Sequence, residues 1–134
     1  MATVATDLTK TSHVIKYEQA REHAYSRSKF TTVEMAAARV IGEVLVYDST
    51  TDNRWETPAT GITSGVIGIL VDPEVYDITT FPVDAELNVV DKNAIAIEPH
   101  LVFDSGLDAT DIANIKALLE AQGVQLAATV NTKD

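Results

Sequence analysis

The sequence contains no cysteine. This absence excludes disulfide bonds, thiolate metal ligands and cysteine nucleophiles, and it leaves the redox compartment open. The opening stretch MATVATDLTK lacks the basic-then-apolar order of a signal peptide, and no apolar run approaches the length of a membrane span. We therefore expect a protein that is made and used in cytosol-like surroundings, or carried out by another vehicle, with no membrane partner.

Motifs of catalysis and phosphate binding are also lacking. The chain has no GxSxG, HExxH, Walker or GxGxxG motif. His13 and His23 have no second ligand at the spacing of a zinc site, and His100 follows a proline where a structural role is expected. These gaps predict a protein that is not an enzyme and has no catalytic, cofactor-binding or metal-binding residues.

One acidic stretch has the alternate spacing of a calcium loop. Asp48, Thr50 and Asp52 could begin such a loop, but Asn53 and Ala59 stand where it needs glycine and a bidentate glutamate. A hairpin turn explains the same residues, because each can bond its own backbone. We therefore interpret this stretch as a turn.

Charge is divided unequally along the chain. Residues 1–40 hold six basic and four acidic residues, a net charge of +2, whereas residues 41–134 hold four basic and sixteen acidic residues, a net charge of −12. An acidic body repels nucleic acid, because phosphate binding depends on cationic side chains. The same surface charge also favours solubility. We expect no nucleic-acid partner.

Residues 1–32 show no sustained hydrophobic period. A helix over residues 16–25 is one alternative, although it lacks large aliphatic side chains. The favoured prediction is an extended N-terminal arm over 1–32 that becomes ordered on a partner. Aromatic side chains would anchor this arm and basic ones would complement the partner's charge. The predicted partner-binding residues are Tyr17, Arg21, Tyr25, Arg27, Lys29 and Phe30.

Residues 33–134 are predicted to form a β-rich domain. The segment EVLVYD, the turn STTDN and the segment RWE read as a hairpin, and VIGILV reads as a buried strand in which Gly68 marks a close backbone approach. VDAELNVV alternates at period two, and AIAI forms another short strand. Short strands at this spacing are typical of a sandwich or barrel.

One helix is predicted at about residues 109–122. Asp108 is placed as its N-cap and Asp111 lies in its first turn. Ile112, Ile115, Leu118 and Leu119 fall on one face, and Gly123 suits the left-handed position after the last turn. VQLAATV can then return as a final strand. The predicted fold is thus mainly β with one packed α-helix and an extended N-terminal arm.

Four segments in this order resemble tailed-bacteriophage head decoration (cement) proteins of the lambda type. They are a D-x-T-T turn before a tryptophan strand at 48–55, a G-I-L strand at 68–70, a V-D-A segment at 83–85 and a helix end A-L-L-E-A-Q-G-V at 117–124. The resemblance covers about residues 40–128. Its motifs are turns and apolar positions without a catalytic signature.

The resemblance implies a small barrel-like or tulip-shaped β domain. It also implies a homotrimer at the three-fold positions of the expanded capsid, made in the host cytoplasm and bound to the outer surface of the virion. The implied partner is the major capsid protein, and the implied role is to stabilise the shell against internal DNA pressure. The arm over 1–32 would grip that protein. Trp55 is expected either in the core or as a subunit contact. The alternative is a small β-rich domain of non-viral role that binds a ligand or carbohydrate.

Overall fold

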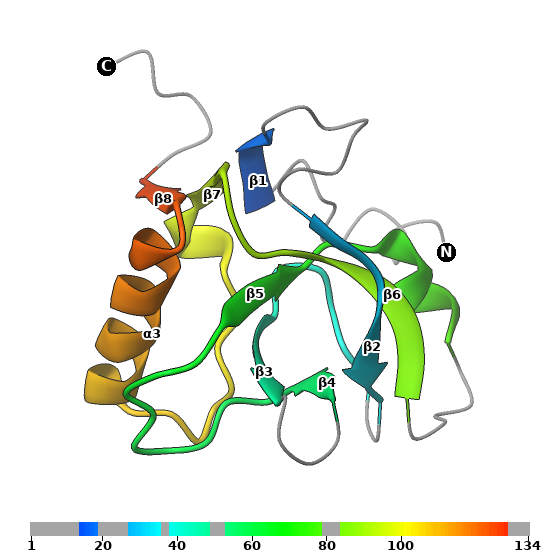
Figure 1. The fold of residues 1–134 in the computed structure, drawn as a ribbon, viewed down its shortest axis with the longest axis horizontal. Helices are drawn as coiled ribbons and strands as arrows, with labels where there is room; N and C mark the ends of the chain where they lie inside the picture. The colour runs from blue at the N-terminus through cyan, green and yellow to red at the C-terminus, as the bar shows by residue number, and fades with distance from the viewer. Residues whose placement is uncertain (1–13, 19–26, 36–37, 49–52, 79–83, 129–134) are drawn as a thin grey trace, which may run out of the picture.

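The protein is described from a computed structural model that covers residues 14–18, 27–35, 38–48, 53–78 and 84–128, with backbone alone for 16–18, 27–30 and 77. Figure 1 shows two sheets and one long helix. The strands are β1 (Ile15–Glu18), β2 (Arg27–Glu34), β3 (Val44–Asp48), β4 (Arg54–Glu56), β5 (Ile67–Leu70), β6 (Asp84–Val90), β7 (Ala94–Ile97) and β8 (Val124–Ala127). The helices are the 3-10 turns η2 (Pro73–Asp77) and η3 (Glu98–His100) and the α-helix α3 (Ala109–Ala121).

Five strands close into a barrel in the order β2-β4-β3-β5-β6. The predicted hairpin is β3 and β4, which are antiparallel with Tyr47 opposite Trp55. β2 closes the ring, because it pairs antiparallel with β6 along its length and parallel with β4 through Val33 and Trp55. The structure therefore confirms the predicted small β barrel with a packed helix.

The remaining strands form a separate sheet in the order β1-β7-β8. β7 and β8 run parallel, and a parallel pair needs a long crossover connection. The chain between them contains η3 and α3, so the helix is that crossover. Figure 1 shows α3 along one side of the molecule, with β8 returning beside β7 at its end.

The helix begins and ends where the sequence predicts. Asp108 is the N-cap, and its carboxylate accepts a hydrogen bond from the backbone N–H of Asp111 at 2.8 Å. The carboxylate of Asp111 in turn accepts a hydrogen bond from the backbone N–H of Asp108, which completes a capping box. Gly123 follows the last turn with φ of 92°, the left-handed region that glycine adopts at least cost.

The interior of the barrel is apolar and is filled around Gly68. A Cβ atom on Gly68 would lie 2.3 Å from Cγ1 of Val89 and 2.7 Å from Cζ3 of Trp55. The close approach predicted at this glycine is thus present. Leu45, Leu87, Val89 and Trp55 belong to the buried hydrophobic cluster of the domain together with Ile67 and Ile69 of β5, and Ile115 and Leu119 join this cluster from α3.

A buried charge lies between β2, β3 and the residues after β4. The guanidinium group of Arg39 is 2.6 Å from a carboxylate oxygen of Glu34 and 2.6 Å from one of Glu43. It also donates to the hydroxyl of Thr57 and, through Nε, to the backbone carbonyl of Glu34. Arg39 is only 6% exposed. The cluster therefore ties three segments together through one paired cation.

The prediction of a separate arm over residues 1–32 needs correction. β1 pairs with β7, β2 forms part of the barrel, and Val14 is fully buried. The predicted boundary between residues 32 and 33 falls inside β2. Residues 14–18 and 27–32 are thus part of the domain, and the alternative helix is strand at residues 16–18. Residues 1–13 and 19–26 lie outside the described residues. These strands lack a sequence period because partner strands, rather than an apolar stripe, fix their place.

Candidate binding site at the barrel mouth

A pocket of about 260 Å³ is lined by Thr31, Tyr47, Trp55, Val66 and Asp91. Each lining residue comes from a different barrel strand or from the position next to one. Thr31, Tyr47 and Trp55 lie in β2, β3 and β4, Val66 immediately precedes β5, and Asp91 immediately follows β6. The pocket is therefore the mouth of the closed barrel, a common place for binding sites in β proteins.

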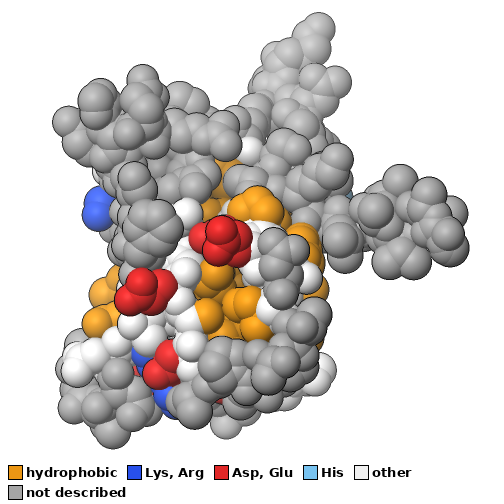
Figure 2. Space-filling model, turned by 90° about the vertical axis from the view of Figure 1, so that its right-hand side faces the viewer, with side chains coloured by type: hydrophobic (Ala, Val, Ile, Leu, Met, Phe, Trp, Pro, Cys, Tyr) orange, Lys and Arg blue, Asp and Glu red, His pale blue; other side chains and the backbone are white. Residues whose placement is uncertain are grey.

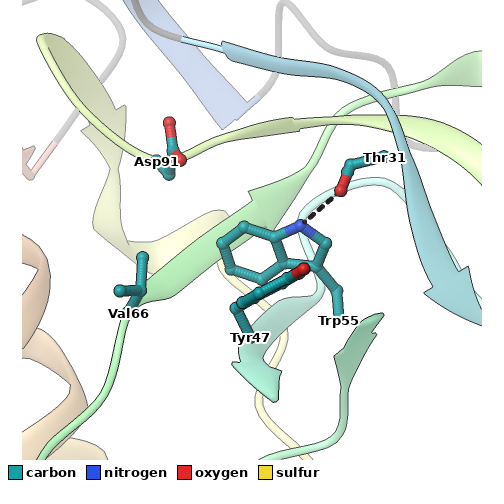
Figure 3. A pocket seen from close by; sticks show the side chains of 5 residues that line it. All are labelled: Thr31, Tyr47, Trp55, Val66 and Asp91. Carbon is teal, nitrogen blue, oxygen red and sulfur yellow. Dashed lines mark hydrogen bonds between the residues drawn. The ribbon is translucent and has the colours of Figure 1, made fainter. Parts of the chain in front are cut away.

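Trp55 forms the floor of this pocket. Figure 3 shows its indole ring between Asp91 on one side and Tyr47 on the other. The indole N–H donates to the hydroxyl of Thr31 at 3.1 Å, and the ring meets Tyr47 edge to face with centroids 5.3 Å apart. Such aromatic pairs and a satisfied indole donor hold the ring in one orientation. The indole ring thus has a hydrogen-bond partner on one side and an aromatic neighbour on the other.

The rim is more open than the floor. Val66 is 47% exposed, which makes it the most exposed of the large hydrophobic residues that the structure describes. The side chain of Asp91 is 12% exposed, and Nζ of Lys92 lies 4.0 Å from its Oδ1. The pocket therefore combines an apolar wall with a carboxylate.

Gln122, at the end of α3, fixes both sides of the rim. Its amide oxygen accepts from the N–H of Ile67 at 2.7 Å, and its amide nitrogen donates to the carbonyl of Ile67 at 2.7 Å. The same nitrogen donates to the carbonyl of Asp91 at 2.8 Å. One side chain thus connects the residue after Val66 with Asp91, so the helix helps to shape the barrel mouth.

The described residues of the pocket carry polar and aromatic side chains. No group of three histidine, aspartate or glutamate side chains within them is close enough to hold a metal ion. His100 is exposed at the end of η3, and His13 and His23 lie outside the described residues. The pocket itself contributes a carboxylate, two hydroxyl groups and two aromatic rings, which suit recognition of a ligand by polar contacts and stacking.

The predicted partner-binding residues fall in several places. Tyr17 lies in β1 opposite Ile95, and Arg27 lies in β2 opposite Val90. Lys29 and Phe30 also lie in β2, at the irregularity between Ser28 and Thr31. Arg21 and Tyr25 lie outside the described residues. The backbone thus places four of the six in strands of two different sheets, so they do not form one continuous segment.

Trp55 is a core residue. It is 2% exposed and packs on Gly68 and Tyr47. The prediction of Trp55 as a subunit contact is therefore wrong, and the core alternative holds, because a side chain this deeply buried has no free surface for a neighbour.

The sequence did not reveal the pocket, although it carried a hint. Tyr47 and Trp55 lie on either side of a short polar segment and are cross-strand neighbours in the β3–β4 pair. That hairpin pairing predicts an aromatic pair. Thr31 and Asp91 come from strands whose neighbours in the barrel cannot be read from a local pattern.

Comparison with protein-family models, with curated proteins and with solved structures finds no match to this chain. Among the described residues, no helix has the length and apolar character needed to cross a membrane.

Proposed function

We propose that this protein is a structural virion protein that binds the outside of an expanded phage capsid as a homotrimer and stabilises the shell. The observation that carries the proposal is that the segments resembling lambda-type decoration proteins build one continuous body. Asp48 ends β3 and Trp55 lies in β4, residues 68–70 lie in β5, and residues 117–124 run from α3 into β8. A barrel with a helix is also the shape that the resemblance implies.

The physics of such a role needs no catalytic group. Clamping a shell under internal pressure requires binding energy across the seams between subunits. Three linked attachment points raise one another's effective concentration, so weak contacts give firm attachment. The partner is the major capsid protein in this proposal.

Surface charge fits a protein partner better than nucleic acid. Exposed acidic side chains include Glu74, Asp84, Glu86, Asp104, Asp108 and Glu120. Figure 2 shows separate acidic side chains around hydrophobic ones on one face. Such a mixed surface favours a partner with basic and apolar groups, and charge complementarity sets the rate and register of docking.

Residues 1–13 replace the longer arm as the proposed attachment segment. They precede Val14, which is fully buried and belongs to the domain. Removal of 1–13 should leave both sheets intact, whereas removal of 1–32 takes away β1 and most of β2 and should prevent folding. Tyr17, Arg27, Lys29 and Phe30 would act from within their strands.

The test compares three chains on expanded, undecorated heads of the phage that encodes the protein. They are the full chain, a chain lacking 1–13, and a control in which the same thirteen residues stand in scrambled order. Cosedimentation and electron microscopy should show the full chain bound at three-fold positions. The bound chain should also raise the temperature at which the heads rupture. The two altered chains should stay folded and bind much less.

Two results would contradict the proposal. One is a folded full-length chain that does not bind expanded heads at any concentration tested. The other is a monomer by light scattering that binds heads at scattered positions. If the chain lacking 1–13 bound as well as the full chain, the decoration role would stand, but residues 1–13 would not be the attachment segment.

The alternative of a ligand- or carbohydrate-binding domain would use the barrel mouth. Its volume of about 260 Å³ falls below the roughly 300–1,000 Å³ of typical small-molecule sites. A pocket of this size suits a single side chain better than a sugar or drug-sized ligand.

A further inference from the structure

We propose that residues 59–66, in the connection between β4 and β5, form the contact by which one copy of this chain binds a second copy. A homotrimer needs a face on which its subunits meet, so this contact rests on the proposed function and locates that face. Figure 1 shows the connection at the outer margin of the molecule, beside α3. All residues of 59–66 are exposed except Ile62, which is partly buried.

Hydrogen bonds from α3 tie this loop to the body of the domain. The carboxylate of Asp111 accepts from the backbone N–H of Gly61 at 2.8 Å, and the side-chain amide of Asn114 donates to the carbonyl of Ile62 at 3.1 Å. The amide of Gln122 bonds both backbone groups of the residue that follows the loop. A loop that is tied down in this way loses less conformational freedom on binding than a free one.

The loop carries no charge, although the chain is acidic. Residues 57–71 are the longest stretch of the sequence without an aspartate, glutamate, lysine or arginine, whereas the whole chain has a net charge of −10. Asp111 touches the loop, but it is only 3% exposed and both of its carboxylate oxygens accept backbone N–H groups. The cores of protein interfaces are depleted in charged residues. The loop shares this property.

Charge selects a second copy as the occupant. Two copies that each carry a net charge of −10 repel one another, and the repulsion is least where the facing surfaces are uncharged. A partner of opposite charge would gain more on the acidic parts of the surface, which include Glu74, Asp84 and Glu86. An uncharged face therefore favours a partner of the same charge.

Val66 supplies the apolar part of the contact. It is 47% exposed, the most of any large hydrophobic residue that the structure describes. Thr63 and Ser64 precede it and are exposed too. Burial of a valine side chain stabilises a complex through the hydrophobic effect, and hydroxyl groups beside it can donate and accept hydrogen bonds across the contact. The loop thus combines apolar surface with neutral polar groups.

The experiment measures self-association of the full chain by sedimentation velocity, with no capsid present. The unmodified chain should associate reversibly at concentrations up to about 1 mM. Its association constant should rise when the salt concentration is raised from about 10 mM to about 150 mM, because salt screens the repulsion between acidic copies. A contact made by ion pairs would weaken with salt instead.

Two substitutions at Ser64 separate the contact from the long-range charge. Ser64→Glu changes the net charge from −10 to −11, and Ser64→Lys changes it from −10 to −9. Both should weaken association roughly tenfold, because each would bury an unpaired charge between the copies. Long-range repulsion alone would weaken association of the glutamate variant and strengthen that of the lysine variant.

His100→Glu is the matched control. His100 is exposed at the end of η3 and neutral in the formal charge at pH 7, so the variant has the same net charge as Ser64→Glu. The neighbouring Glu98 pairs with Lys116, which lies two residues from Asn114 on α3 and so faces away from the loop. The control should associate within about twofold of the unmodified chain.

Val66→Thr provides a second route if a variant at Ser64 fails to fold, which Trp55 fluorescence reports. It keeps the shape of the side chain but replaces a methyl group by a hydroxyl, and it should weaken association several-fold.

Three outcomes would overturn the inference. The first is a chain that stays monomeric at every concentration and salt tested. The second is self-association that neither substitution at Ser64 alters, which would place the contact between copies on another face. The third is tighter association of Ser64→Lys than of the unmodified chain. The binding of expanded heads decides the decoration role separately, so failure of this contact and failure of that role are distinguishable.

Discussion

The indole ring of Trp55 lies against the bare α-carbon of Gly68 inside the barrel. A Cβ atom at Gly68 would be 2.7 Å and 2.9 Å from two ring carbons and 2.3 Å from Cγ1 of Val89. Real Cβ atoms do not approach so closely. We expect Gly68→Ala to lower the free energy of unfolding by about 1–3 kcal/mol, the usual cost of overpacking a core. Urea unfolding followed by Trp55 fluorescence measures it.

Gly106→Ala is the matched control for this substitution. Gly106 is exposed, and its nearest neighbour is the end of the Asp104 side chain at 3.0 Å, which can move aside. Its unfolding free energy should change by less than about 0.5 kcal/mol. Equal effects of the two substitutions would mean that the barrel interior is looser than the contact of Trp55 with Gly68 implies.

Much of the barrel could be predicted because its strands carry strong local patterns. β5 is a continuous apolar run, and the sequence between β3 and β4 is polar and short. The residues that cap α3, Asp108 at its start and Gly123 after its end, are equally easy to recognise in the sequence. These elements were predicted with boundaries close to those of the structure, because the signals are local.

β1 and β2 could not be predicted in the same way. Their sequences, IKYE and RSKFTTVE, mix basic, aromatic and hydroxyl residues without alternation. What places β2 is its long antiparallel pairing with β6, from Arg27 opposite Val90 to Glu34 opposite Asp84. Main-chain bonds carry no sequence signal of their own. A polar strand that closes a barrel is therefore predicted as an extended arm when only the sequence pattern is considered.

Arg39 is the buried cation on which a second prediction depends. It pairs with Glu34 and Glu43 at 2.6 Å and is 6% exposed. Replacing one partner of a buried cluster leaves the other charges without compensation. We expect Arg39→Gln to lower the free energy of unfolding by about 3–5 kcal/mol. Thermal unfolding followed by circular dichroism checks this value.

Arg54→Gln provides the comparison. Arg54 also pairs with two carboxylates, those of Glu56 and Asp84, but all three side chains are partly exposed. Ion pairs at such positions contribute about 0–1 kcal/mol and weaken with salt. A loss at Arg54 as large as that at Arg39 would contradict the role assigned to burial.

The capping box of α3 gives a third prediction. Asp108→Ala removes the carboxylate that accepts from the N–H of Asp111. We expect a loss of about 0.5–2 kcal/mol in the free energy of unfolding, because the first turn keeps an unpaired donor. Thr110→Ala, exposed in the same turn, should be neutral or slightly stabilising, since alanine is the better helix former. If both variants unfold at the same urea concentration, the cap does not stabilise the helix.

The candidate site was harder to predict than the fold, because it joins residues that are distant in sequence. Gln122 shows the difficulty. Nothing in the helix pattern singles out this residue, yet its side chain reaches Ile67 and Asp91 in the barrel. Only the packing of α3 on the barrel brings them together. Local patterns predict elements, whereas long-range contacts determine the site.

Gln122→Leu tests whether the helix holds the barrel mouth open. It leaves the N–H and carbonyl of Ile67 without the amide that bonds both, so we expect a loss of about 1–3 kcal/mol in the free energy of unfolding. Gln125→Leu makes the same chemical change at an exposed position of β8 and should alter stability by less than about 0.5 kcal/mol. Gln122 also donates to the carbonyl of Asp91, so the substitution removes a second tie between α3 and the barrel mouth. Urea unfolding followed by Trp55 fluorescence measures the loss. Equal stability of the two variants would show that the barrel mouth does not depend on these bonds from the helix.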